Sequence, residues 1–172
     1  MPQPLDSLRK YYRTKRFFKV GKAAYPWVRR KLKNKPTGLE LVRTENDVLI
    51  PTDQNESATS NVRIRGVIDP GMEWVINLYA RPRSAVIDIG SNIGLLSILM
   101  AAKVGNNGLV YAIEPNIQLH KKINNLFWLN NFSNLNLVHA ACSSTPGTAM
   151  LNIPEDHSTS SIGKNGTEEV PV

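Results

Sequence analysis

The sequence has almost no cysteine, few histidines and no long apolar run. Cys142 is the single cysteine among 172 residues, which excludes an internal disulfide and a cysteine-based zinc site. His120, His139 and His157 show no metal-ligand spacing, so we expect ordinary packing or surface residues and predict no metal site. No apolar run approaches the ~20 residues that a membrane-spanning helix needs, and no apolar signal segment follows Met1. We therefore expect a cytoplasmic protein.

Positive charge is concentrated at one end of the chain. The net charge is +7, but residues 1–35 contain 12 Lys and Arg against one acid, whereas residues 36–172 contain 9 against 13 acids. This pattern predicts a basic N-terminal arm, 1–35, in front of a mildly acidic body. Three interpretations of the arm stay open: a helix resting its apolar stripe on the body, a basic amphipathic helix contacting an anionic surface or a partner, and nucleic-acid contact or organelle targeting. No specific nucleic-acid partner is expected.

The next part of the chain, 36–84, predicts a hairpin and a helix that lead into one main domain. Residues 39–50 read as two short strands around a polar turn, and 51–61 read as a loop. A helix is expected to start after Asp69. Its apolar face should consist of Met72, Val75, Ile76 and Tyr79, which lie at i, i+3, i+4 and i+7.

The remainder, 85–172, predicts an α/β sheet. Short β-branched runs closed by glycine or acid alternate with longer apolar segments of helical spacing, and the strands read as buried on both faces. The order strand, helix, strand, helix, strand is typical of a Rossmann-like doubly wound sheet, in which ligands bind at the carboxyl ends of the strands. The expected elements are strand 85–90, helix 94–105, strand 109–114, helix 116–130 with Leu119, Ile123, Leu126 and Phe127 on its core face, strand 135–141, and an extended arm 148–154 before a polar, turn-rich stretch 154–169.

The turn after the first strand indicates the kind of ligand. Its glycines, Gly90 and Gly94, allow a sharp turn and close backbone approach, but their G-x-x-x-G spacing differs from the G-x-G-x-x-G of dinucleotide sites. Asp88 stands two residues before the first glycine. A carboxylate there opposes a pyrophosphate and favours a cationic ligand such as S-adenosylmethionine, which has an ammonium and a sulfonium group and no phosphate.

The end of the second strand adds a second carboxylate. Glu114 lies 24 residues after Gly90 and is placed to accept hydrogen bonds from two ribose hydroxyls. This feature suits NAD and S-adenosylmethionine equally, so Asp88 and the glycine spacing decide between them. A structural interpretation stays open, in which Asp88 caps the turn and Glu114 caps the following helix.

These segments resemble the FkbM family of S-adenosylmethionine-dependent methyltransferases. The resemblance rests on VIDIGSNIGLLSI, VYAIEPN and NNLFWLNNFSNLNLVHAACSSTPGTAMLNI, which match a D-x-G-x-N-x-G turn, an E-P-N strand end, an asparagine-rich helix end and an A-x-x-x-x-x-G step into a hairpin. It covers roughly residues 66–172. The chain departs from the family at Ser144, where many members have an acid.

The resemblance implies a class I methyltransferase fold and assigns cofactor contacts. Glu114 would hold the ribose, and the turn at Cys142–Ser143 would approach the adenine, with Cys142 as a small apolar filler. His139 is expected mid-strand in the core, and no catalytic residue can be named. The methionine end of the cofactor would be lined by Asp88, Gly90, Ser91, Asn92 and Gly94.

The family's later T-L-D step and K-I-D-x-E-G strand are not present in this sequence. The chain therefore resembles the N-terminal half of a methyltransferase domain, incomplete at the C-terminus, and residues 1–172 alone are expected to be inactive. The first interpretation of function is O-methylation of a small-molecule or glycan acceptor, such as a sugar or another hydroxyl-bearing metabolite. The alternative is a truncated, non-catalytic nucleoside-binding or interaction module, and the third is an NAD-dependent oxidoreductase, which Asp88 disfavours.

Overall fold

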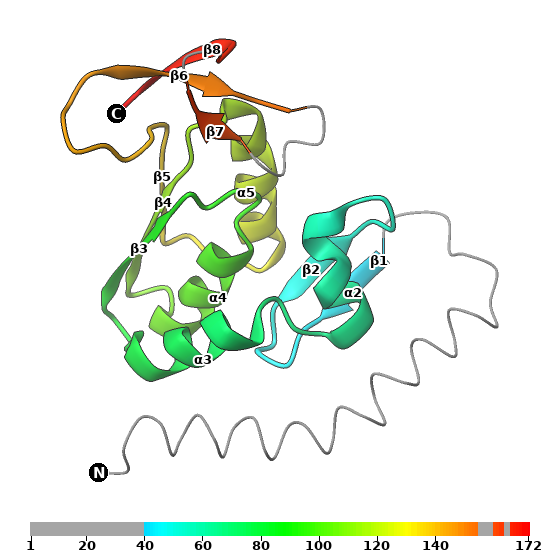
Figure 1. Ribbon diagram of the computed structural model, residues 1–172. Helices are drawn as coiled ribbons and strands as arrows, with labels where there is room; N and C mark the ends of the chain where they lie inside the picture. The colour runs from blue at the N-terminus through cyan, green and yellow to red at the C-terminus, as the bar shows by residue number, and fades with distance from the viewer. Residues whose placement is uncertain (1–39, 155–159, 164–165) are drawn as a thin grey trace.

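The computed structural model describes residues 40–154, 160–163 and 166–172. The predicted basic arm, 1–35, lies outside these residues. The described part is a mixed α/β structure with two antiparallel sheets and one parallel sheet (Figure 1). Its elements are β1 (Glu40–Arg43), β2 (Leu49–Thr52), the 3-10 turn η1 (Ser57–Thr59), α2 (Ser60–Arg65), α3 (Pro70–Tyr79), β3 (Ala85–Ile89), α4 (Leu95–Val104), β4 (Leu109–Ile113), α5 (Ile117–Leu129), β5 (Leu135–Val138), β6 (Thr148–Asn152), β7 (Ser161–Ile162) and β8 (Glu168–Pro171).

The three strands of the parallel sheet are ordered β3-β4-β5, and α4 and α5 connect them. The predicted succession of strand, helix, strand, helix, strand is therefore confirmed. In the register of the sheet, Asp88 pairs with Ala112 and Ile89 pairs with Ile113. The carboxyl ends of β3 and β4 consequently lie side by side, and the turn after β3 meets the residues that follow β4.

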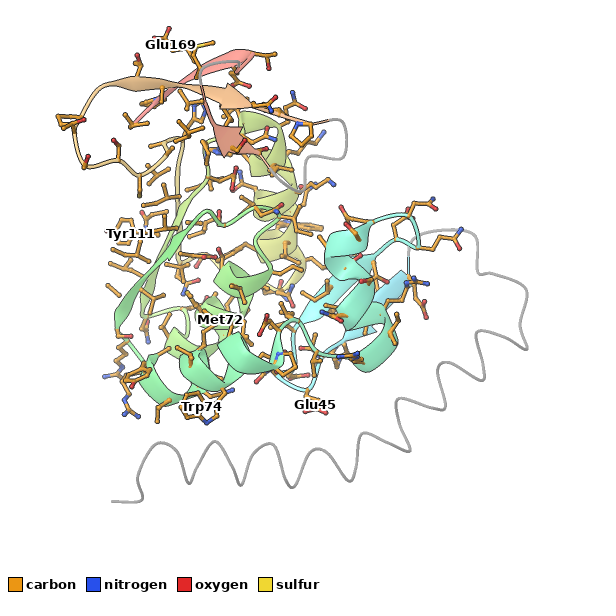
Figure 2. The ribbon with its side chains drawn as sticks, in the orientation of Figure 1. Glu45, Met72, Trp74, Tyr111 and Glu169 are labelled. Atoms are coloured by element: carbon orange, nitrogen blue, oxygen red, sulfur yellow. The ribbon has the colours of Figure 1, made fainter. Side chains whose placement is uncertain are left out.

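Helices cover one face of this sheet. Val110 and Ala112 of β4 are fully buried in a core that includes residues of α4 and α5. The alternate residues point the other way: Ile87 is 60% exposed and Ile89 is 63% exposed. Tyr111 lies on the same outer face, on which no helix of the described ranges packs (Figure 2). The prediction of strands buried on both faces is wrong, because both connecting helices pack on the same side.

The second connecting helix follows the sequence prediction closely. Asn116 caps α5, since its side-chain Oδ1 accepts a hydrogen bond from the backbone N–H of Gln118 at 3.0 Å. The predicted core positions of α5 are all buried, namely Leu119, Ile123, Leu126 and Phe127. When a helix has one apolar and one polar side, the 3.6-residue spacing of its apolar residues therefore identifies the side that packs against the core.

The N-terminal hairpin is joined to α5 by an asparagine. Strands β1 and β2 pair antiparallel as predicted, and Asn130 exchanges two hydrogen bonds with the backbone of Leu49, at 2.7 and 2.9 Å. The loop predicted for 51–61 is wrong at both ends, because β2 extends to Thr52 and η1 and α2 occupy 57–65. The polar composition of 51–61 gives no periodic apolar pattern that would indicate these short elements. They gain their stability from packing on β2.

Helix α3 begins as predicted but buries a different side. Asp69 accepts hydrogen bonds from the backbone N–H groups of Gly71 and Met72 at 2.8 and 2.9 Å. Ile76 is buried, yet Met72 is exposed and Tyr79 is 68% exposed. The other buried side chain of α3 is that of Glu73, whose carboxylate accepts a hydrogen bond from the backbone N–H of Ile68 at 2.7 Å. A hydrogen-bonded carboxylate thus takes an inward position that periodicity assigned to apolar residues.

The last sheet, ordered β7-β6-β8, is antiparallel. The extended arm predicted at 148–154 is confirmed as β6. The stretch 154–169 was predicted to be polar and turn-rich, but β7 lies inside it and β8 begins there, with Val170 fully buried. No helix within the described ranges has both the length and the apolar character needed to cross a membrane.

Replacing Gly94 by alanine should destabilise the fold more than replacing Gly90. Both have positive φ, +83° and +73°, a conformation that costs an L-residue roughly 1–2 kcal/mol. A Cβ on Gly94 would also lie 3.2 Å from Cγ2 of Ile123, whereas a Cβ on Gly90 meets nothing within 4 Å. We expect Gly94→Ala to lower the free energy of unfolding by about 2–3 kcal/mol and Gly90→Ala by about 1–2 kcal/mol, measured by urea denaturation. Equal losses would contradict the contact with Ile123, and Gly163→Ala serves as the unstrained control.

Candidate functional site

The candidate site is built on the turn between β3 and α4. Gly90, Asn92 and Gly94 all have positive φ, at 73°, 52° and 83°. Asparagine is one of the few side chains that tolerate this region, so the sequence G-x-N-x-G suits the conformation. The backbone N–H groups of Gly90 and Ser91 both donate to the carbonyl oxygen of Ile113, at 2.9 and 3.1 Å. The turn is thereby held against the end of β4.

Glu114 joins this turn to the start of α5. Its Oε2 accepts the backbone N–H of Asn92 at 2.7 Å, and its Oε1 accepts the backbone N–H of Asn116 at 2.9 Å. The residue is 4% exposed. The structural role that the sequence left open is therefore present, and each carboxylate oxygen retains capacity for a second hydrogen bond. Glu114 can shape the turn and still accept from a ligand hydroxyl.

Asp88 lies beneath the first turn of α4. Its Oδ2 accepts the hydroxyl of Ser97 at 2.5 Å, and the backbone N–H of Ser97 also donates to the carboxylate. Burial raises the pKa of the Asp88 carboxyl above its usual range, and the two hydrogen bonds from Ser97 act in the opposite direction. The carboxylate thus lies at the N-terminal turn of α4, where backbone N–H groups stabilise a negative charge.

The fold brings most of the predicted site residues together. Asp88 is the next-to-last residue of β3, which pairs with β4; the turn 90–94 follows this strand, and Glu114 is hydrogen-bonded directly to that turn. Ser143 is different: it is exposed in the segment after β5, and its Oγ accepts the backbone N–H of Thr145 at 3.4 Å. Within the described residues, hydrogen bonds therefore connect the turn, predicted to contact the methionine, with Glu114, predicted to contact the ribose. Ser143, the predicted adenine contact, is not part of this hydrogen-bond network.

Two polar atoms beside the turn suit a polar ligand. Ser91 Oγ and Asn116 Nδ2 are buried, and neither has a hydrogen-bond partner within the described residues. Buried polar groups are normally paired, so two unpaired groups, one in the turn and one two residues after Glu114, favour an additional partner here. Space next to Gly90 is also open, because a Cβ there would touch nothing. These features fit a nucleoside ligand with several hydroxyl and amine groups.

A pyrophosphate fits this turn poorly. The backbone N–H groups of Gly90, Ser91, Asn92 and Gly94 all donate within the chain, to Ile113, Glu114 and Ser91 oxygens. A phosphate-binding turn presents such groups to the ligand instead. The buried Asp88 adds negative charge at the same helix end. Geometry and charge therefore both oppose a dinucleotide.

Sequence reasoning missed a pair of histidines beside Glu114. His120 Nε2 lies 2.8 Å from the carbonyl oxygen of Glu114, and His139 Nε2 lies 2.8 Å from that of Pro115. The two rings meet edge to face with centroids 5.4 Å apart. His139 follows β5 rather than lying inside it, so its predicted mid-strand core position is wrong. The parallel order could have revealed the pair, since both residues follow carboxyl ends of neighbouring strands.

Two other expectations concern reactive or metal-binding groups. Cys142 is a free, exposed thiol and not the buried filler that was predicted, because the segment after β5 leaves the core. Within the residues that the structure describes, no group of three or more His, Cys, Asp or Glu side chains is placed to hold a metal ion.

A cavity of about 850 Å³ lies between the turn 90–94 and helix α5. Its walls come from α5, from β2 and the segment 53–59 that follows it, and from Asn92, Ile93 and Leu95. No sequence motif marks it, because the three segments are separate in the chain. Comparison of the chain with models of known families and with curated proteins gives no match.

Proposed function

We propose that the chain is an S-adenosylmethionine-dependent methyltransferase of the FkbM type, with a Rossmann-like class I fold. It acts on a hydroxyl group of a sugar or another hydroxyl-bearing metabolite. The observation that carries the proposal is the pair of buried carboxylates, Asp88 and Glu114, on either side of a glycine turn whose amides are occupied internally. This arrangement suits a cationic nucleoside without phosphate.

The residues have distinct roles in this proposal. Asp88 and the turn, with Gly90, Ser91, Asn92 and Gly94, hold the methionine end of the cofactor. Glu114 holds the ribose, and Ser143 is the proposed adenine contact. When bound, S-adenosylmethionine supplies a methyl carbon to the acceptor oxygen, the carbon–sulfur electron pair stays on sulfur, and the hydroxyl proton passes to solvent.

The chain's own contribution is binding and orientation. The hydrogen bonds from Asn92 and Asn116 to Glu114 keep the ribose-binding carboxylate at a set position relative to the turn. Correct positioning of two reactants lowers the activation barrier by roughly 7–11 kcal/mol in favourable cases, so a rigid turn that fixes the cofactor increases the rate. The same proposal places the protein in the cytoplasm, and contact with an anionic surface stays one of the three open interpretations of the arm 1–35.

A non-catalytic nucleoside-binding module is the second candidate. The observation that favours it is that both carboxylates at the turn already accept hydrogen bonds from the chain, Asp88 from Ser97 and Glu114 from two amides. Neither is thereby poised as a general base. Transfer of a radiolabelled methyl group to an acceptor would exclude the module, which binds the cofactor without turnover; absence of transfer does not exclude the methyltransferase, because residues 1–172 alone are expected to be inactive.

Thermal shift with S-adenosylhomocysteine against NAD tests the ligand class. A ligand present at 100 times its dissociation constant adds about 2.7 kcal/mol, which raises the melting temperature by roughly 5–10 °C in a chain of this size. We expect this rise with S-adenosylhomocysteine and none with NAD. A rise with NAD alone would overturn the proposal and favour the oxidoreductase. The variant Ser143→Ala reports separately on the adenine contact, because this exposed side chain has little effect on the fold.

A further inference from the structure

The cavity beside the turn has mainly apolar walls. Helix α5 contributes Leu119, Leu126 and Leu129, which recur at helical spacing on one side of it. Ile93 of the turn 90–94 and Leu95, the first residue of α4, also line it. Five aliphatic side chains from α5, the turn and α4 thus line a volume large enough for a small molecule.

Polar side chains also line this cavity, and some of them are paired with each other; the polar lining consists of Asp53, Asn55, Glu56, Ser57, Thr59, Asn92, Lys122 and Asn125. Lys122 of α5 and Glu56 of the opposite segment form an ion pair at 2.7 Å, so they join two walls. Thr59 also donates to the backbone carbonyl of Glu56, at 3.3 Å. Trp128 is the remaining large residue of the lining and is 80% exposed, which places an aromatic ring at the opening.

We propose that this cavity binds the methyl acceptor and that the acceptor is an alcohol with an extended apolar body rather than a free sugar; this rests on the proposed function. A sugar packed against the leucine and isoleucine side chains would leave hydroxyl groups on that side unpaired, which weakens its binding. An alkyl chain gains about 0.8 kcal/mol for each buried methylene. The aliphatic side of the cavity therefore favours a ligand with an apolar body.

The cavity and the cofactor turn share a residue. Asn92 lines the cavity, and its backbone N–H is bonded to Glu114, the proposed ribose contact. A molecule in the cavity therefore lies against the turn that holds the cofactor, as a methyl acceptor must. The sharing also predicts reciprocal coupling, in which each ligand changes the affinity of the other by the same factor.

Calorimetric titration with 1-hexanol, 1-octanol, 1-decanol and methyl β-D-glucoside tests the proposal on the full chain. We expect affinity to rise about fourfold for each methylene and the glucoside to give no saturable binding. Trp128→Ala and Leu129→Gln should each weaken 1-decanol by about tenfold or more. The control Tyr79→Ala removes another exposed aromatic side chain from a helix, one that does not line the cavity, and should leave binding unchanged.

The outcomes are distinct. Glucoside binding tighter than decanol would overturn the acceptor class. If decanol binding were lost in Ile87→Gln and kept in Trp128→Ala, the ligand would bind on the exposed face of the sheet, and the assignment of the cavity as its site would be wrong. S-adenosylhomocysteine is titrated into the same samples. If decanol binds in the cavity and S-adenosylhomocysteine does not bind, the methyltransferase proposal is wrong and the cavity is a site for an apolar ligand. Binding of S-adenosylhomocysteine together with a preference for the glucoside keeps the methyltransferase and removes the apolar acceptor.

Discussion

Replacing Glu114 by alanine should lower the free energy of unfolding by about 2–5 kcal/mol and abolish binding of S-adenosylhomocysteine. The carboxylate is buried and accepts the backbone N–H groups of both Asn92 and Asn116. Each buried donor left without a partner costs about 1–3 kcal/mol. The turn would also lose its connection to α5, so binding would fail even in protein that remains folded.

Urea denaturation and calorimetry on the same samples measure the two effects. Glu114→Gln should be intermediate, because its amide retains one acceptor oxygen and turns a donor toward the second N–H group. Glu40→Ala removes an exposed carboxylate from β1 and should change stability by about 0.5 kcal/mol or less. If Glu114→Ala were as stable as Glu40→Ala, the carboxylate would not be what holds the turn.

Replacing Asp88 by asparagine should stabilise the ligand-free protein and weaken cofactor binding. Burial raises the pKa of Asp88, so the folded protein binds this proton more tightly than the unfolded chain does. The contribution of Asp88 to the free energy of unfolding therefore falls as pH rises from the unfolded pKa, near 3.8, through the higher folded pKa. Asparagine removes this loss while keeping the shape of the side chain.

The comparison of wild type and Asp88→Asn across pH is the measurement. The variant should be the more stable protein at pH 8, and the difference should shrink as pH falls below the folded pKa of Asp88. Affinity for S-adenosylmethionine should drop about tenfold to a hundredfold at pH 8, the range for losing one partner of a charged hydrogen bond. Asp47→Asn, in the exposed turn between β1 and β2, controls for the general loss of a carboxylate. Unchanged affinity in Asp88→Asn would remove Asp88 from the cofactor site.

The sheet and the centre of the site could be predicted because local pattern and tertiary structure agree there. β-Branched runs and glycine turns located β3, β4 and β5, and the parallel order placed Glu114 beside the turn 90–94. The short helix α2 and the buried Glu73 could not be predicted in this way. Their stability comes from contacts with elements distant in the chain, which a local pattern does not record.

Sequence patterns located the parallel strands, the connecting helices, the residues of the turn and the two carboxylates that flank it. Tertiary packing put both helices on one face of the sheet, which leaves Ile87 and Ile89 exposed. It alone paired His120 with His139 and enclosed the cavity between α5, the turn and the segment 53–59. The physical reason is that hydrogen bonds and backbone conformations within a turn follow from nearby residues, whereas burial and cavities depend on which distant segments pack together.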